Sequence, residues 1–588
     1  MNISHPREPN AVRPGTAMSR GEAGDARLDP VSMHPSVSER LAKLTTDQRA
    51  AATAVPGPIL CVAPAGSGKT TTLIARIAWL IDTGAAPGAI AAITFNTKAA
   101  RELEGRLDLA LETLGVEPGS VRVRTFHALG REILRDVGVD VSGLVDRSEV
   151  LRSLWPDLTS AELARCDTAF SRLKLEFRTS AATIAADATA GPMAAAFVAY
   201  ETALADRGQL DFDDLIRRAL AELEERPALL ATWRACCTDL LVDEVQHVDR
   251  SQLDLALLLA APADRIFLVG DDDQSIYGWR LADVRRILTI GERLPGLRRV
   301  DLEVNHRCPV PVVVRAVRLI ERNEERFAKA IHPRPDAAGS VVLAPDASDG
   351  PERAARILGT WPADGSTRAF LARTNRELRP ALVAAVRLGI PFRADRVPLL
   401  VDEPGLDPLL ARLVSETSDG LPLLVRLGAM RRSILSGPAR TSTSVGPAPT
   451  PEAATDAELL EALLAWAPAV DTVADLIAAI EALRARLADL RREDAILTMA
   501  TAHSTKGLEF DHVAVLGMEE GRFPSGRSVA DADDPIRALE EERRLGYVAW
   551  TRARRSLTLS YDPAVPSPFL LEAFTPEELG LGVRRAPG

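Results

Sequence analysis

Residues Cys61–Thr72 read Cys-Val-Ala-Pro-Ala-Gly-Ser-Gly-Lys-Thr-Thr-Thr and lie between an apolar run and a helical pattern. The apolar run, Ile59–Val62, predicts a buried strand, and the periodicity of Leu73–Ile81 predicts a helix. Small residues between a strand and a helix allow backbone N–H groups to converge on an oligophosphate. The helix directs its positive end at the same anion. The segment therefore predicts a phosphate-binding loop.

Two side chains of this loop have the chemistry that bound phosphates require. Lys69 can reach the outer phosphates, and the Thr70 hydroxyl can ligate Mg²⁺. The strict pattern has Gly where this chain has Ala63, so an ordinary glycine-containing turn is the alternative. Lysine is rare here, with only six among 71 Lys and Arg residues, and its compact ammonium fits among phosphates better than a planar guanidinium does. The nucleotide-binding candidates in the loop are Ala63, Pro64, Ala65, Gly66, Ser67, Gly68, Lys69, Thr70 and Thr71.

The composition indicates a soluble globular protein of several domains. The chain has 588 residues, of which 46% are hydrophobic and 26% are charged, and its net charge is −11. This charge argues against a protein coated in nucleic acid but allows a narrow basic track in a cleft. The five cysteines form no CxxC pair, so neither a zinc ribbon nor a disulfide framework is indicated, and reduced thiols in a cytosol fit best. No run approaches about 18 apolar residues, so no membrane span is predicted.

Alternating strands and helices predict parallel α/β sheets, in which functional groups gather at the carboxyl ends of the strands. Strands are expected at Ala91–Phe95, where a helical pattern follows from Asn96, and at Val121–Arg124, which ends in Thr125-Phe126-His127. Phe95 and Phe126 fall at such strand ends. For either residue alone, an aromatic side chain packed under a loop is the plainer interpretation.

Polar residues in two other predicted elements also suit a nucleotide. The predicted strand Leu240–Glu244 ends in two acids, of which Asp243 can hold Mg²⁺ through water and Glu244 can polarise the attacking water. A helix cap is the alternative for such a pair. In the capped helix predicted over Leu41–Ala54, Gln48 is either a surface residue or an amide that reads an adenine edge.

A further predicted strand, Arg265–Gly270, leads into a segment rich in polar and aromatic side chains. Gln274 follows this strand and can sense a γ-phosphate. Tyr277 and Trp279 beside Arg280 can form a stacking platform for bases, and a structural aromatic corner is the alternative.

These segments, in this order, resemble the successive motifs of the UvrD/Rep/PcrA family of superfamily 1 DNA helicases. The loop, the acids with Gln246, and Gly270–Arg280 come first. The later motifs are resembled by Asn305-His306-Arg307, Arg373-Thr374-Asn375, Ala500–Phe510 and Glu540–Arg554. Seven or more ordered motifs between about 41 and 560 make chance agreement negligible.

The resemblance implies two RecA-like cores that hold ATP between them and single-stranded DNA across their tops. It implies that Gln48 and Glu509 contact adenine and ribose. It also implies that Gln274, Arg307 and Arg552 sense the γ-phosphate, and the two arginines come from the second core. Hydrolysis would then depend on closure of the cleft. The implied catalytic residues are Lys69, Asp243, Glu244, Gln274, Arg307 and Arg552; the added ATP-binding residues are Gln48, His306, Gly507 and Glu509; the metal ligands are Thr70 and Asp243; and the DNA-binding residues are Phe95, Asn96, Thr125, His127, Tyr277, Trp279, Arg280 and His503.

Three positions depart from the family pattern. Pro64 replaces a usual Gly of the loop, so a carbonyl remains but an N–H is lost. His247 stands where an Asp is usual. His306 replaces the Tyr that stacks on adenine, which leaves the nucleotide preference open although an imidazole can also stack. None of these changes removes a group that hydrolysis needs.

The expected fold class is α/β, with two RecA-like P-loop NTPase cores of parallel sheet that each carry a helical insertion. The second core is expected to begin near Val300, and Ser436–Thr455 is expected to be a flexible loop. We expect neither a nuclease domain nor a long partner-binding tail after Tyr561. The predicted parts are a disordered N-terminal tail at 1–38, the first core at 39–140 and 206–300, its helical insertion at 141–205, the second core at 301–400 and 494–575, its reduced helical insertion at 401–493, and a C-terminal tail at 576–588.

The expected function is an ATP- and Mg²⁺-dependent DNA helicase or translocase that moves 3′ to 5′ on single-stranded DNA in repair, replication or recombination. The alternatives are a translocase that strips proteins with little unwinding and an ATP-gated DNA-binding regulatory module. A P-loop kinase or GTPase fails to explain the later motifs. The expected partners are single-stranded DNA, single/double-strand junctions and an unidentified protein, with the chain a monomer or weak dimer in a bacterial cytosol or nucleoid.

Overall fold

The computed structural model describes residues 33–187, 191–348, 350–394, 397, 399–415, 421–436, 456–457, 459–461, 463–464 and 470–580. The predicted N-terminal tail lies outside these residues up to position 32. Residues 35–38 of that predicted tail instead begin helix α1 (Pro35–Ala42), which buries Val37 and Leu41. The predicted loop Ser436–Thr455 lies outside the described residues after Ser436, where helix α19 ends.

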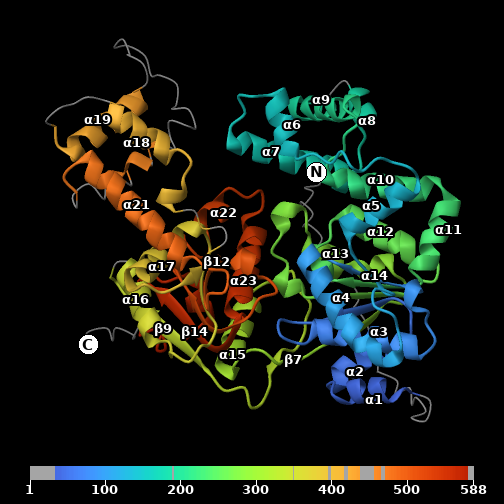
Figure 1. The fold of residues 1–588 in the computed structure, drawn as a ribbon. Coiled ribbons are helices and arrows are strands. Elements are labelled where there is room, and N and C mark those ends of the chain that lie inside the picture. Colours follow the sequence, from blue (N-terminus) through green and yellow to red (C-terminus); the bar gives the residue numbers. More distant parts are fainter. Residues whose placement is uncertain are drawn as a thin grey trace, which may run out of the picture.

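Six parallel strands form the first sheet, in the order β3-β2-β4-β5-β1-β6. An almost continuous apolar sequence, such as Ile-Phe-Leu-Val-Gly in β5, is typical of parallel strands buried on both faces. Helices α2, α3 and α4 pack on one face, and α5, α10 and α12 pack on the other (Figure 1). The bounds are β1 (Ile59–Val62), β2 (Ile90–Thr94), β3 (Arg122–Thr125), β4 (Asp239–Asp243), β5 (Ile266–Gly270), β6 (Arg298–Asp301), α2 (Thr46–Ala52), α3 (Lys69–Asp82), α4 (Thr97–Leu111), α5 (Phe126–Asp136), α10 (Phe212–Glu225) and α12 (Arg250–Ala260).

Six parallel strands also form the second sheet, in the order β11-β12-β10-β13-β14-β9. Helices α16, α17 and α21 pack on one face, and α15, α23 and α24 pack on the other. Two parallel sheets with helices on both faces confirm the predicted α/β class. The bounds are β9 (Ser340–Pro345), β10 (Arg368–Ala372), β11 (Phe392–Arg393), β12 (Leu497–Thr501), β13 (Phe510–Val515), β14 (Ala553–Tyr561), α15 (Val310–Ile320), α16 (Gly350–Thr360), α17 (Asn375–Leu388), α21 (Val473–Leu490), α23 (Pro535–Trp550) and α24 (Pro568–Ala573).

Helices between β3 and β4 build a separate small core beside the first sheet. Phe170, Phe197 and Tyr200 fill this core. It is joined to α10 through the buried Lys174, whose Nζ lies 2.9 Å from Asp211 Oδ2 and 3.0 Å from an oxygen of Asp214. A buried ammonium is stable only when carboxylates pair with it. The contacts of Lys174 with Asp211 and Asp214 therefore hold the small core against α10. The helices are α6 (Arg147–Leu154), α7 (Ser160–Ser171), α8 (Ala181–Ala185) and α9 (Pro192–Asp206).

The structure differs from the predicted elements at two places. The single helix predicted over Leu41–Ala54 is two helices, α1 and α2, because Thr45 caps the second one in a reciprocal capping box with Gln48. The strand that contains Val300 is β6, which pairs with β1 and completes the first sheet. The second sheet begins only at β9.

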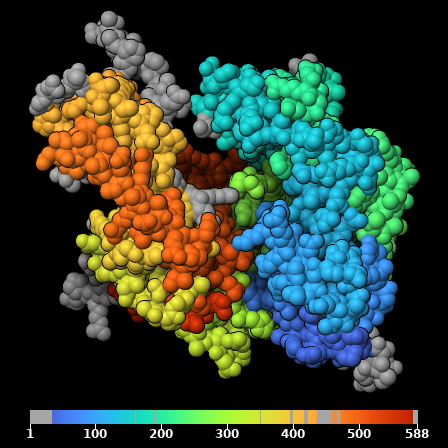
Figure 2. All heavy atoms as spheres, viewed as in Figure 1, coloured from blue at the N-terminus to red at the C-terminus, as the bar shows by residue number. Residues whose placement is uncertain are grey.

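The two sheets and their helices form two halves that face each other across a hollow, which Figure 2 shows between the blue-to-cyan half and the yellow-to-red half. Between the halves lies a cavity whose first wall is formed by residues that follow β1, β4 and β5, whereas Glu509 and Arg552 of the opposite wall directly precede β13 and β14. Among the described residues, no helix is both long enough and apolar enough to cross a membrane.

Candidate active site

The predicted phosphate-binding loop connects β1 to helix α3. Gly66 and Gly68 have φ angles of 70° and 85°, a left-handed conformation that glycine adopts readily. A Cβ on Gly66 would lie 2.8 Å from Asn305 Oδ1, and a Cβ on Gly68 would lie 2.5 Å from Gln48 Nε2. Backbone conformation and close approach therefore both require glycine at these positions.

Polar groups converge at the mouth of the loop. Lys69 Nζ donates to the carbonyl oxygen of Ala63 at 2.8 Å. Ser67 Oγ is buried and has no hydrogen-bond partner within the described part of the chain. The N-terminus of α3 directs its free N–H groups at the same space. An orphaned hydroxyl, an ammonium and a helix N-terminus together fit an oligophosphate.

The two acids at the end of β4 have different protonation behaviour. Burial, together with the negative charge of Glu244, raises the pKa of Asp243 to about 7. Burial opposes ionisation of Glu244 too, but the positive charges of Lys506 and Lys69 outweigh it and lower the pKa of Glu244 to about 2. Glu244 has a φ of 56°, and its N–H donates to Asp243 Oδ1 at 2.9 Å. A carboxylate held in such a sparsely populated conformation is typical of functional sites.

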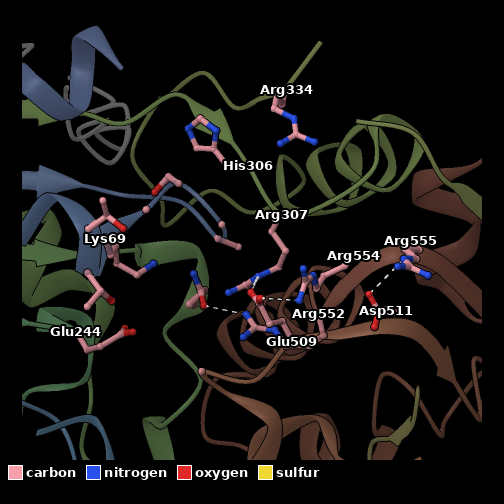
Figure 3. A pocket seen from close by; sticks show the side chains of 18 of the residues that line it. Lys69, Glu244, His306, Arg307, Arg334, Glu509, Asp511, Arg552, Arg554 and Arg555 are labelled. Atoms are coloured by element: carbon pink, nitrogen blue, oxygen red, sulfur yellow. Dashed lines mark hydrogen bonds and ion pairs between the residues drawn. The ribbon is translucent and has the colours of Figure 1, made fainter. Parts of the chain in front are cut away.

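The loop opens into a cavity of about 510 Å³, a size that suits a nucleotide. Residues of both halves line it: Lys69 and Glu244 lie on one side, and Arg307 and Arg552 lie on the other (Figure 3). The predicted residues that line the cavity are Ala65, Gly66, Ser67, Gly68, Lys69, Thr70, Thr71, Glu244, Gln274, His306, Arg307, Gly507, Glu509 and Arg552.

The side of the cavity that the second half supplies is rich in arginine. Arg307 Nε donates to Glu509 Oε2 at 2.8 Å. Arg552 is buried, and its burial, together with the like charge of Arg307, lowers the pKa of Arg552 to about 9. Positive charge that is desolvated in this way is stabilised by an anion. Sequence reasoning missed four further arginines that line the same cavity, which are Arg106, Arg334, Arg554 and Arg555.

Some candidates lie behind the lining rather than in it. Gln48 is buried and supports the loop, since its Nε2 donates to the Ser67 carbonyl at 2.8 Å and its Oε1 accepts from Thr45 N–H at 3.1 Å. His306 does line the cavity, and its N–H donates to the Gly66 carbonyl at 2.9 Å. Burial lowers the pKa of His306, so its ring is neutral at pH 7 and able to stack. The other candidates behind the lining are Ala63, Pro64 and Asp243.

Four aromatic or cationic candidates adjoin one another next to Glu244. The rings of Phe95 and Tyr277 stack with centroids 5.2 Å apart. Tyr277 meets Trp279 edge-on at 6.1 Å, and the Arg280 guanidinium lies 4.8 Å from the Trp279 ring centroid. The Tyr277 hydroxyl donates to the carbonyl of His503 in the second half at 3.4 Å. The four side chains thus form one patch, which we call the aromatic track.

Besides His503, whose carbonyl accepts from Tyr277, the remaining DNA candidates are two helix caps and a second histidine. Asn96 and Thr125 cap helices α4 and α5, because their side-chain oxygens accept backbone N–H groups. His127 lies 6.0 Å from the ring of Phe212, a residue that sequence reasoning missed. Phe212 is 56% exposed. Its position directly after the capping residue Asp211 could have identified it from the sequence, because a large apolar side chain at the start of that helix does not reach the core.

The two predicted metal ligands, Thr70 and Asp243, suit an ion that takes its other ligands from the nucleotide and from water. Among the described residues, no group of three or more His, Cys, Asp and Glu side chains is arranged to bind a metal. Thr70 lines the cavity, and Asp243 lies close enough to Lys69 for their charges to interact. A hydroxyl and a carboxylate of this kind suit Mg²⁺, which takes one or two protein ligands and completes its shell with phosphates and water.

Comparison with known proteins gives matches along most of the chain. A family model of the UvrD/REP helicase N-terminal domain matches residues 44–295, and one of the UvrD-like helicase C-terminal domain matches residues 466–563. The chain is 28% identical to ATP-dependent DNA helicase PcrA of Staphylococcus epidermidis, over 88% of this chain and 83% of that protein. It is also 28% identical to DNA helicase II of Escherichia coli, over 89% of this chain and 85% of that protein.

The two family models together match more than half of the chain, and they fall on the two halves that supply opposite walls of the cavity. The order of motifs, the two parallel sheets and the similar proteins agree with one another. The chain belongs to the UvrD/Rep/PcrA-type helicases.

Proposed function

We propose that the chain hydrolyses ATP with Mg²⁺ and uses the energy to move on single-stranded DNA in the 3′ to 5′ direction. The observation that carries this proposal is the cavity of about 510 Å³, which has a phosphate loop on one wall and arginines of the other half on the opposite wall. The similar proteins are named as ATP-dependent DNA helicase and DNA helicase II, and this supports the same activity here.

The residues have separate roles in this reaction. Lys69 and the N–H groups at the start of α3 bind the β- and γ-phosphates. Thr70 and Asp243 would hold Mg²⁺, which would supply positive charge to the phosphates when bound. Glu244 is a carboxylate at neutral pH and orients and polarises the attacking water. Arg307 and Arg552 stabilise the charge that develops on the γ-phosphoryl oxygens.

Movement follows from the division of these groups between two halves. Groups on one wall bind the nucleotide, while the stabilising arginines belong to the other wall, so turnover requires the halves to close. The aromatic track adjoins Glu244, and its Tyr277 reaches the second half at His503. Bases stacked on Tyr277 and Trp279 would therefore be bound at the place where closure moves one half against the other.

The test measures ATP hydrolysis by the whole chain with and without single-stranded DNA, then translocation on single strands of defined polarity. We expect strong stimulation by DNA and arrival at the 5′ end of the strand. A rate that is equal with and without DNA would contradict the coupling, and arrival at the 3′ end would contradict the polarity. Loss of hydrolysis in Lys69→Ala, with the fold unchanged, identifies the cavity as the site.

A second candidate is a translocase that separates strands poorly on its own. The described part of residues 401–493 includes helices α18 (Leu406–Ser415), α19 (Leu423–Ser436) and α21; α21 contacts α17 of the second half, and α18 contacts α19 and α21. An insertion of this size offers little surface to grip a duplex. Repair, replication and recombination are all compatible with such a motor. An additional protein could supply contacts to double-stranded DNA.

A further inference from the structure

Lys506 joins the two halves at the catalytic carboxylate. It follows the short helix after β12 in the second half, and it reaches the end of β4 in the first half. Its Nζ lies 2.9 Å from Glu244 Oε2 and also donates to Nε2 of His247. The Lys506 and Glu244 side chains are only 10% and 20% exposed, so water screens this ion pair less than it screens a surface pair.

The same ammonium lies beside the aromatic track. Lys506 Nζ is 5.6 Å from the ring centroid of Phe95 and 5.7 Å from that of Tyr277. At these distances the ring faces attract a cation. Tyr277 also holds the segment that carries Lys506, because its hydroxyl donates to the His503 carbonyl at 3.4 Å. One lysine therefore touches both the base-stacking rings and the carboxylate that handles the attacking water.

We propose that Lys506 is a positioning residue that restrains Glu244 until single-stranded DNA on the aromatic track draws its ammonium away. This inference rests on the proposed function. Glu244 Oε2 accepts from Lys506 and from Gln246 Nε2, the latter at 2.6 Å, so its lone pairs are shared between two donors. A carboxylate whose oxygen is shared in this way accepts a proton from water less readily.

DNA competes for Lys506 in two ways. Phosphate oxygens are strong acceptors for an ammonium, and a base stacked on Phe95 or Tyr277 takes the ring face that Lys506 now contacts. Burial removes water from the Lys506 ammonium in its present position, and this desolvation lowers its pKa to about 8. Movement toward phosphates relieves part of this desolvation and frees Glu244 Oε2.

The first experiment compares ATP turnover by the wild type and Lys506→Met, without DNA and at saturating single-stranded DNA. Without DNA, we expect kcat of the variant to rise about fivefold or more, which is the scale of a coupling between two sites. The ratio of the DNA-stimulated to the DNA-free rate should fall by the same factor. A fall or no change in the DNA-free rate would overturn the proposal.

One further variant serves as a control for this experiment, and another replaces Lys506→Met if that variant does not fold. Lys43→Met removes a lysine that also pairs with a glutamate, at 2.7 Å, but at an exposed position directly after helix α1, and both rates should stay at the wild-type values. Lys506→Leu also removes the hydrogen-bond donor and gives the same readout if the methionine variant does not fold. A purely structural Lys506 would lower both rates together and would leave their ratio unchanged.

The second experiment tests whether DNA binding is linked to the ion pair of Lys506 with Glu244. It measures the affinity for a labelled single strand by fluorescence anisotropy in the absence of nucleotide. If Glu244 and DNA compete for Lys506, Glu244→Gln should tighten DNA binding about fivefold in the wild-type background. In the Lys506→Met background the same change should have no effect. An equal effect of Glu244→Gln in both backgrounds would overturn the proposal, because the two residues would then act independently.

The outcomes separate this inference from the function on which it rests. A wild type that hydrolyses no ATP, with or without DNA, contradicts the proposed function. A wild type that is stimulated by DNA, with a Lys506→Met variant that keeps the same low DNA-free rate, contradicts only the role of Lys506.

Discussion

Arg552 donates from Nη2 to Oε1 of Gln274 at 3.3 Å, and this contact joins the two halves of the molecule at the cavity. Gln274 follows β5 of the first sheet, and Arg552 follows helix α23 of the second half. Gln274 is itself oriented by its own Nε2, which donates to Asp271 Oδ2 at 2.6 Å. A γ-phosphate bound beside these two side chains would contact both halves at once, so its release after hydrolysis would remove those additional contacts.

The first prediction concerns the arginines of the second half. Arg307→Ala and Arg552→Ala should each lower the DNA-stimulated kcat by about 10³-fold or more, because an arginine that stabilises transferred phosphoryl charge contributes on that scale. Nucleotide affinity should change much less. Arg318→Ala, an exposed arginine on α15, serves as the matched control. A loss of less than tenfold in both cavity variants would contradict closure of the two walls on the γ-phosphate.

The second prediction separates binding from chemistry. Lys69→Ala should abolish ATP turnover while the thermal unfolding midpoint stays near the wild-type value, since Lys69 lines a cavity rather than a core. Glu244→Gln should still bind a fluorescent ATP analogue but should not hydrolyse it, because an amide cannot accept a proton as a carboxylate does. Normal turnover by Glu244→Gln would show that another group activates the water.

The site was predictable wherever a local pattern marks the end of a buried strand. The predicted strand Ile59–Val62 has the same bounds as β1, and Asp243 ends β4 as expected, although Glu244 lies just beyond the strand. The pairing of β6 with β1 was missed because a short strand with charged residues carries no sign of which sheet it joins. The contact of Lys506 with Glu244 was missed for a similar reason. The two residues are distant in the sequence, and only the packing of the two halves against each other brings them together.

The third prediction concerns the aromatic track. Trp279 is 58% exposed, and the Arg280 guanidinium lies over its ring. Trp279→Ala should weaken single-strand binding by about 1–3 kcal/mol through lost stacking, with little dependence on base sequence. Binding of both proteins should weaken as salt rises, because phosphate contacts release counterions. Leu109→Ala, at a residue that is 74% exposed on α4, is the control, and equal affinities for all three proteins would make Trp279 a structural residue.

The fourth prediction concerns pH and stability. Asp249 caps α12, and burial, with a smaller contribution from the nearby acids Asp213 and Glu176, raises its pKa to about 7. Because the folded chain holds this proton more tightly than the unfolded chain, the stabilisation is complete below pH of about 4 and is lost as pH rises to about 7. Asp249→Asn keeps the cap but cannot ionise. It should match the wild type at pH 4 and exceed its stability at pH 8 by at most about 4 kcal/mol.

Thermal unfolding midpoints of the two proteins across this pH range give the measurement. Asp146→Asn is the matched control, because Asp146 also caps a helix but hydrogen bonds from Ser148 lower its pKa. The sign of the pH dependence should therefore be opposite for that variant. A constant difference between Asp249→Asn and the wild type at all pH values would show that the residue does not titrate between folded and unfolded states in this range.

The last prediction concerns strand separation. Helices α18 and α21 of the second insertion pack against each other, and α21 also contacts α17 of the second half, so part of their apolar surface is already buried within the protein. The catalytic groups on both walls of the cavity are present, whereas a small insertion has little surface left to hold a duplex. The isolated protein should therefore translocate steadily on single strands but unwind a 3′-tailed duplex much more slowly than it translocates. Translocation and unwinding are measured separately, under single-turnover conditions, with duplexes of increasing length and with a 5′-tailed duplex as the polarity control. If a monomer unwinds long duplexes at its translocation rate, the insertion is only a shortened spacer. If the protein does not translocate at all, the proposed motor activity is wrong.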